Sequence, residues 1–144
     1  MNKIMNNHLL PPKNGSTKNV RIHGYLMEEN NLSPLFFYGS DISEIEKLEK
    51  ENEYFAEPLS DETDITVVQI IWAVRNEMAR TVEDVLARRT RVLFCDSKLA
   101  IELAPIVAEI MMKELNRDGI WRKKQVDEFI QLAKGYSLHN AFEK

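Results

Sequence analysis

The chain has 144 residues, of which 44% are hydrophobic and 29% charged, and these values are typical of one soluble globular domain. Its net charge of -4 and its pI near 5.5 argue against a general nucleic-acid binder. The single cysteine, Cys95, cannot form an internal disulfide, so we expect a reducing compartment and a core or helix-entry position for it. Because no apolar run approaches ~20 residues and no secretory signal is evident, we expect a soluble, cytoplasmic chain without a transmembrane segment.

The first 39 residues show no helical period. Residues 1–16 are rich in Asn and Pro and are interpreted as a leader or linker. Residues 17–39 are interpreted as an extended linker segment, because Val20 and Ile22 alternate before Gly24. The apolar trio that begins at Leu35 is expected to hold this segment in place.

The first predicted helix covers residues 41–52. Asp41 is its expected cap, and Ile42, Ile45 and Leu48 form a narrow apolar stripe. Residues 53–64 are predicted to be a loop.

The most apolar helix is predicted to start at Thr66, which has capping-box spacing with Gln69. Its apolar residues cover well over half its circumference, which predicts a core helix packed on several sides. They are Val67, Val68, Ile70, Ile71, Trp72, Val74 and Met78.

A second helix is predicted from Thr81, with Glu83 and Asp84 in its first turn, where negative charge favours a helix start. Its buried face is expected to consist of Val82, Val85 and Leu86.

Two longer helices follow. Asp96 or Ser97 is expected to cap the first, and Pro105 inside it implies either two helices or one kinked helix. Asp118 is expected to cap the last helix, which would close at Gly135. The expected buried residues are Leu99, Leu103, Ile106, Val107, Ile110 and Met111 in the first, and Ile120, Val126, Phe129, Ile130, Ala133 and Tyr136 in the second.

These patterns predict an all-α fold. It would be a compact bundle of five or six helices over residues 40–136, with a short extended N-terminal segment and a tail at 137–144.

The usual catalytic motifs are missing from the sequence. It has no GxGxxG, P-loop, HExxH or CxxC pattern, and His8, His23 and His139 lie in the two ends. We therefore predict no catalytic, cofactor-binding or metal-binding residue in this chain.

The strongest candidate site is a cluster of arginines and acids. Its members are Arg75, Glu77, Arg80, Asp84, Arg88, Arg89 and Arg91, with Glu83 beside them. The spacings Glu77–Arg80, Arg80–Asp84 and Asp84–Arg88 fit a structural ladder of ion pairs. Alternatively, since the arginines outnumber the acids, some guanidinium groups could contact acidic groups on another domain or a phosphorylated ligand.

The sequence also resembles a known family. The stretch ITVVQIIWAVRNEMARTVEDVLARRTRVLF and the following DSKLAIELAPIVAEIMMKEL resemble the C-terminal helical domain of FAD-dependent glycerol-3-phosphate dehydrogenases, and TKNVRIHGY is similar to the linker before it. The resemblance implies that FAD and the catalytic residues belong to a parent enzyme, which oxidises glycerol 3-phosphate to dihydroxyacetone phosphate and passes electrons to quinone at the cytoplasmic face of the inner membrane. The resemblance further implies that the parent enzyme is peripheral to the membrane and that its flavin and substrate domain is this domain's partner.

Two functions follow from this resemblance. The chain is either a non-catalytic docking and stabilising domain of the dehydrogenase or a free-standing helical protein-interaction module derived from it.

Overall fold

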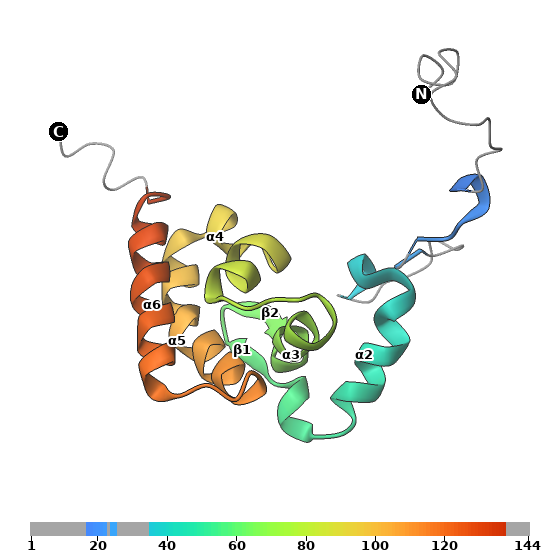
Figure 1. Cartoon of the computed structure of the whole chain (residues 1–144), viewed down its shortest axis with the longest axis horizontal. Helices are drawn as coiled ribbons and strands as arrows, with labels where there is room; N and C mark the ends of the chain where they lie inside the picture. Colours follow the sequence, from blue (N-terminus) through green and yellow to red (C-terminus); the bar gives the residue numbers. More distant parts are fainter. Residues whose placement is uncertain (1–16, 23, 26–34, 138–144) are drawn as a thin grey trace, which may run out of the picture. The chain divides into compact units, whose positions relative to one another are not determined.

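The computed structural model describes residues 17–22, 24–25 and 35–137. It divides into two compact units, Met1–Asp41 and Ile42–Lys144, which we call the N-terminal unit and the helical unit and treat separately. Figure 1 shows the chain coloured along its sequence.

The described part of the N-terminal unit contains two 3₁₀ helices, η1 (Thr17–Asn19) and η2 (Phe36–Asp41). Gly24 and Gly39 both have positive φ, and a Cβ on Gly39 would lie 1.7 Å from the Gly24 carbonyl oxygen. Only glycine fits where two backbone segments approach so closely. The apolar trio only partly meets expectation, because Phe36 and Phe37 are exposed.

The helical unit begins with α2 (Ile42–Glu49), whose buried residues Ile42, Ile45 and Leu48 are the predicted stripe. The helix ends before the predicted residue 52, because Asn52 already caps the next element, η3 (Glu53–Ala56), by accepting a hydrogen bond from Tyr54 N–H at 3.0 Å. This local competition shortens the helix.

The predicted loop over 53–64 is wrong in part, because it contains a β-hairpin. Strands β1 (Pro58–Ser60) and β2 (Thr63–Thr66) are antiparallel, with Pro58 opposite Thr66 and Ser60 opposite Thr63. Strands of three and four residues are too short to show a period, and proline at a strand's first residue is compatible with pairing.

The core helix α3 (Val67–Asn76) forms as predicted. Gln69 Oε1 accepts a hydrogen bond from Thr66 N–H at 2.8 Å, and all eight residues from Val67 to Val74 are buried. The prediction for Met78 is wrong, because the helix has already ended: Met78 has φ 58° and is 78% exposed.

Three further α-helices follow in the unit: α4 (Val92–Cys95), α5 (Ser97–Glu114) and α6 (Gly119–Lys134). Asp96 caps α5 and Asp118 caps α6, each through its carboxylate, as predicted. The helix α5 continues through Pro105, so the single-helix alternative holds there. Cys95 is exposed at the end of α4, so it is not a core residue, but it directly precedes Asp96, the cap of α5, which fits the helix-entry alternative.

The core lies where α3 and α5 pack, with α6 along α5 and α2 against α3 (Figure 1). The helix α6 is buried along one stripe, Gln125, Phe129 and Ala133, at intervals of four residues. Ile120 lies off that stripe and is 80% exposed, and Tyr136 lies beyond the helix end and is 49% exposed. Both were predicted to be buried, as was Ile106 of α5, which is also exposed.

The fold is therefore mostly α, as predicted, with one small sheet among the described residues. In the same part of the chain, no helix is long and apolar enough to cross a membrane.

Candidate docking site

The arginine segment, residues 75–91, connects the end of α3 to the start of α4. It contains a turn at Met78, a short helical start at Val82, and the π-helix η4 (Asp84–Arg89). Thr90 N–H donates to the Val85 carbonyl at 2.9 Å, which is the i to i+5 bond of a π-helix. The segment ends at Arg91, which has φ 60°.

Thr81 and Asp84 fix the start of this helix by capping each other. Asp84 N–H donates to Thr81 Oγ1 at 3.1 Å, and Thr81 N–H donates to Asp84 Oδ2 at 3.0 Å. Partial burial alone would raise the pKa of Asp84, but hydrogen bonds from the Arg80 N–H, from Thr81 and from Arg88 outweigh it and lower that pKa. Asp84 is therefore a structural carboxylate that stays ionised.

The predicted ladder of ion pairs is only partly correct. Arg88 contacts Asp84, as predicted, and also Glu83 at 2.6 Å. Instead of pairing with Glu77 or Asp84, the Arg80 guanidinium donates to the carbonyl oxygens of Val74 at 2.9 Å and Ala79 at 2.8 Å. Helical spacing does not apply at residues 77–80, because the chain there is not helical.

Glu77 pairs instead with Arg89, at 3.2 Å between the carboxylate and Nε. Arg89 also donates to the Glu77 carbonyl oxygen. The two residues are twelve positions apart, so this contact closes the segment into a loop. It could not be predicted from helical spacing.

Arg75 lies outside this group and binds α5. Its Nε donates to Glu114 Oε2 at 2.7 Å, and its Nη2 donates to Glu114 Oε1 at 3.0 Å. The hydrogen bonds and negative charge of Glu114 raise the pKa of Arg75. This two-pronged pair joins the end of α3 to the end of α5.

Arg91 differs from the other four arginines. Its guanidinium makes no hydrogen bond or ion pair with the described residues, and its side chain is exposed. Its carbonyl oxygen accepts a hydrogen bond from Phe94 N–H at 3.1 Å. Of the predicted site residues, Arg91 is thus the one available to a partner.

Gln125 is a structural contact that the sequence did not reveal. It is buried in α6, where its Oε1 accepts from Val82 N–H at 3.1 Å and its Nε2 donates to Glu128 at 3.2 Å. It therefore satisfies a backbone donor of the arginine segment from another helix. Its only sequence signal is a polar residue on the same stripe as Phe129.

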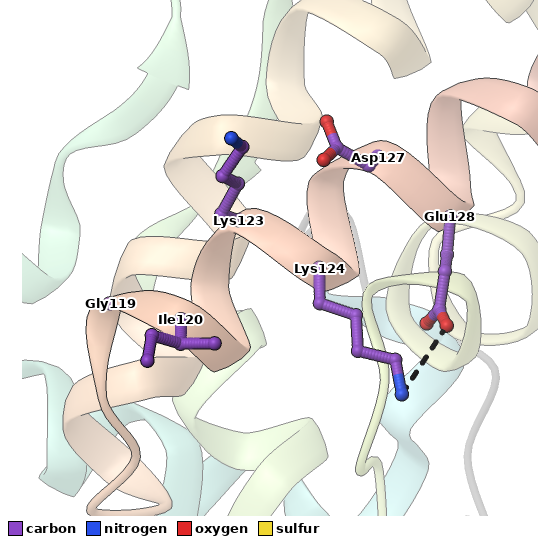
Figure 2. A pocket seen from close by; sticks show the side chains of 6 residues that line it. All are labelled: Gly119, Ile120, Lys123, Lys124, Asp127 and Glu128. Atoms are coloured by element: carbon purple, nitrogen blue, oxygen red, sulfur yellow. Dashed lines mark ion pairs between the residues drawn. The ribbon is translucent and has the colours of Figure 1, made fainter.

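The described residues of this unit form surface hollows, two of which lie along α6. Figure 2 shows the larger, about 430 Å³ on the outer face of α6, where Lys123 and Lys124 are balanced by Asp127 and Glu128. Lys124 and Glu128 form an ion pair at 3.7 Å. The smaller, about 70 Å³, lies between Thr81 and α6. Neither presents a surplus of positive charge for a phosphate.

The three histidines of the chain, His8, His23 and His139, lie outside the described residues. Within those residues, no group of three or more His, Cys, Asp or Glu side chains could hold a metal ion.

Comparisons with known proteins identify the domain. A family model described as the C-terminal domain of alpha-glycerophosphate oxidase matches residues 16–125. The mitochondrial glycerol-3-phosphate dehydrogenase of Schizosaccharomyces pombe is 32% identical over 71 residues, which are 49% of this chain and 10% of that protein. The matched segment is thus about a tenth of the relative's length. No solved structure matches the chain.

The family model covers most of the chain, including the whole arginine segment. The chain therefore belongs to the family of C-terminal domains of alpha-glycerophosphate oxidase.

Proposed function

We propose that this chain is a docking and stabilising domain of an FAD-dependent enzyme that oxidises glycerol 3-phosphate to dihydroxyacetone phosphate. The observation that carries the proposal is the family match over residues 16–125, which includes the arginine segment. In that segment Arg75, Arg88 and Arg89 bind acids of the same chain, so they support its fold rather than a reaction.

FAD is assigned to another domain. A dinucleotide is bound where a parallel strand turns into a helix and the helix start holds the pyrophosphate. The sheet formed by the described residues has two antiparallel strands, and β2 runs into α3 through Thr66 without a glycine. The residues present do not fit this cofactor.

The resemblance to respiratory dehydrogenases supports two further parts of the proposal. The parent enzyme would act at the cytoplasmic face of the inner membrane and pass electrons to quinone. This chain would reach that site through its partner domain.

The test uses the FAD- and substrate-binding part of a glycerol-3-phosphate dehydrogenase from the same organism, produced without the segment that corresponds to residues 16–125. We call it the flavin fragment. The purified chain is added to it or fused to it, and turnover with an acceptor dye and the rate of thermal inactivation are measured. We expect slower inactivation or faster turnover with the chain present.

The chain alone is the control. It should be colourless and should not oxidise glycerol 3-phosphate with added FAD and dye. Stoichiometric flavin in the purified chain, or dye reduction by it alone, would refute the non-catalytic role. If the flavin fragment gains nothing, the alternative of a free-standing interaction module takes precedence.

A further inference from the structure

The arginine segment neutralises most of its own positive charge. Arg75 binds Glu114, Arg88 binds Glu83 and Asp84, and Arg89 binds Glu77. The Arg80 guanidinium donates to the carbonyl oxygens of Val74, in the last turn of α3, and of Ala79, after that helix. Arg91 is exposed and has no partner among the described residues. Its positive charge is therefore available to an anionic group of a binding partner.

Phe94, three residues after Arg91, belongs to a pair of exposed aromatic rings. Phe94 is one helical turn further on in α4, is 60% exposed, and is tied to Arg91 by its backbone hydrogen bond. Its ring meets that of Tyr136, just beyond the C-terminal end of α6, edge to face with centroids 5.5 Å apart. Two large rings that pack on each other and remain exposed form a small, rigid apolar surface.

The backbone holds Arg91 in an unfavourable conformation. Its φ of 60° is left-handed, which costs a residue with a side chain roughly 1 kcal/mol or more relative to ordinary geometry. Met78 and Asn116 share this left-handed φ, so the backbone alone does not explain why arginine is here, but glycine would fit the position without strain.

We propose that Arg91, Phe94 and Tyr136, which we call the Arg91 patch, form the surface that docks onto the flavin-bearing part of the same enzyme. This inference rests on the proposed function and names its contact surface. The partner surface would carry a carboxylate for the Arg91 fork and apolar side chains for the two rings. Arginine and tyrosine are the residue types that most often dominate the affinity of protein interfaces.

The chemistry favours a protein surface over a free phosphate. A phosphate ion gains from several converging donors, whereas Arg91 offers one guanidinium, and the exposed rings of Phe94 and Tyr136 add apolar surface rather than donors. The matched relative carries about nine tenths of its length outside the match, which leaves a large body for such a contact.

The experiment measures the Kd between the flavin fragment and variants of the full chain. Arg91→Glu reverses the charge, and Phe94→Ala removes one ring; we expect each to weaken binding roughly tenfold or more. Arg91→Gly removes the guanidinium but suits the left-handed backbone, so it should weaken binding while leaving thermal unfolding unchanged or slightly raised. This variant separates docking from folding.

The matched control is Arg117→Glu. Arg117 is also exposed and lies in the turn before α6, at the opposite end of that helix from Tyr136. Arg117→Glu changes the net charge by as much as Arg91→Glu does. Its Kd for the flavin fragment should stay within about twofold of the wild-type Kd, since long-range charge effects are screened by salt.

The outcomes distinguish the two proposals. If the wild-type chain does not bind the flavin fragment, the proposed function fails. If it binds and the Arg91 and Phe94 variants bind equally well, the docking assignment to this patch fails alone. Self-association of the chain that these variants abolish, or binding of glycerol 3-phosphate to the isolated chain that Arg91→Gly abolishes, would also overturn the assignment.

Discussion

In the N-terminal unit the large apolar side chains of Val20, Ile22, Phe36 and Phe37 are exposed, whereas in the helical unit every residue of α3 from Val67 to Val74 is buried. The two units are therefore stabilised differently. The helical unit has its own apolar core, which is the main favourable contribution to folding. The described part of the N-terminal unit depends on the close backbone approach of Gly24 and Gly39.

The two units should therefore lose stability through different kinds of substitution. A core loses stability in proportion to the apolar volume removed, while a close backbone contact is lost as soon as one atom is added. The four predictions below test this contrast, from the largest expected effect to the smallest.

Trp72→Ala should have the largest effect. Trp72 is buried in the middle of α3, at 7% exposure, so we expect a loss of ~3 to 5 kcal/mol in the free energy of unfolding of the helical unit. Urea unfolding followed by circular dichroism measures it. Trp121→Ala, at a half-buried position in the first turn of α6, is the control and should cost less. A loss below about 1 kcal/mol for Trp72→Ala would contradict the core assignment.

Gly39→Ala should disrupt the N-terminal unit only. The added Cβ would meet the Gly24 backbone, which cannot move aside as a side chain can. We expect faster hydrogen exchange or proteolysis within residues 35–41, with the unfolding of the helical unit unchanged to within about 0.5 kcal/mol. Gly119→Ala is the matched control: nothing lies within 4 Å of its Cβ, and at the first residue of α6 alanine should leave the stability of the helical unit unchanged or slightly raised. A lower stability of the helical unit in Gly39→Ala would show that the units are coupled.

Asp84→Asn should cost about 1–2 kcal/mol at neutral pH, because it weakens the reciprocal cap with Thr81 and the pair with Arg88. The pKa of Asp84 is lowered in the folded state, so its stabilising contribution is present above its unfolded pKa of about 3.9 and is lost as the pH falls through the folded pKa. The stability difference between wild type and Asp84→Asn should therefore shrink on acidification. A stability difference that grew in acid would refute the assignment.

Arg88→Ala should have the smallest effect. Its side chain is 53% exposed although it pairs with two acids, so we expect a loss of about 0 to 1 kcal/mol in the free energy of unfolding. Adding salt should reduce even this difference. If Arg88→Ala instead unfolds the helical unit, the arginine segment is a structural requirement of the core rather than a surface element.

The local signals in the sequence were the reliable ones. Caps at Thr66, Asp96 and Asp118 were correct because a helix start is decided within four residues. The prediction that Val82, Val85 and Leu86 are buried is also correct, because these apolar residues lie close together in the sequence and share one side of a short helical segment.

The failures arose where distant residues decide. The hairpin depends on pairing across a turn, Gln125 depends on which helix meets the arginine segment, and Arg89 reaches Glu77 only after the chain has folded back. Counting charges suggested five candidate arginines, but only the structure shows which of them their own chain already binds. The π-helix also changed the pairing, since it brings Glu83 within reach of Arg88 at i,i+5 as well as Asp84 at i,i+4.

The π-helix η4 also has a consequence for how this domain tolerates changes in length. A π turn contains one residue more than an α turn of similar rise, so deleting one residue within Asp84–Arg89 could restore an α-helix without moving the ends of the segment far. The same deletion within α3 would rotate every following side chain by roughly 100° and turn its buried residues away from their neighbours. Single-residue insertions and deletions among homologues should therefore gather at η4 and be absent from α3.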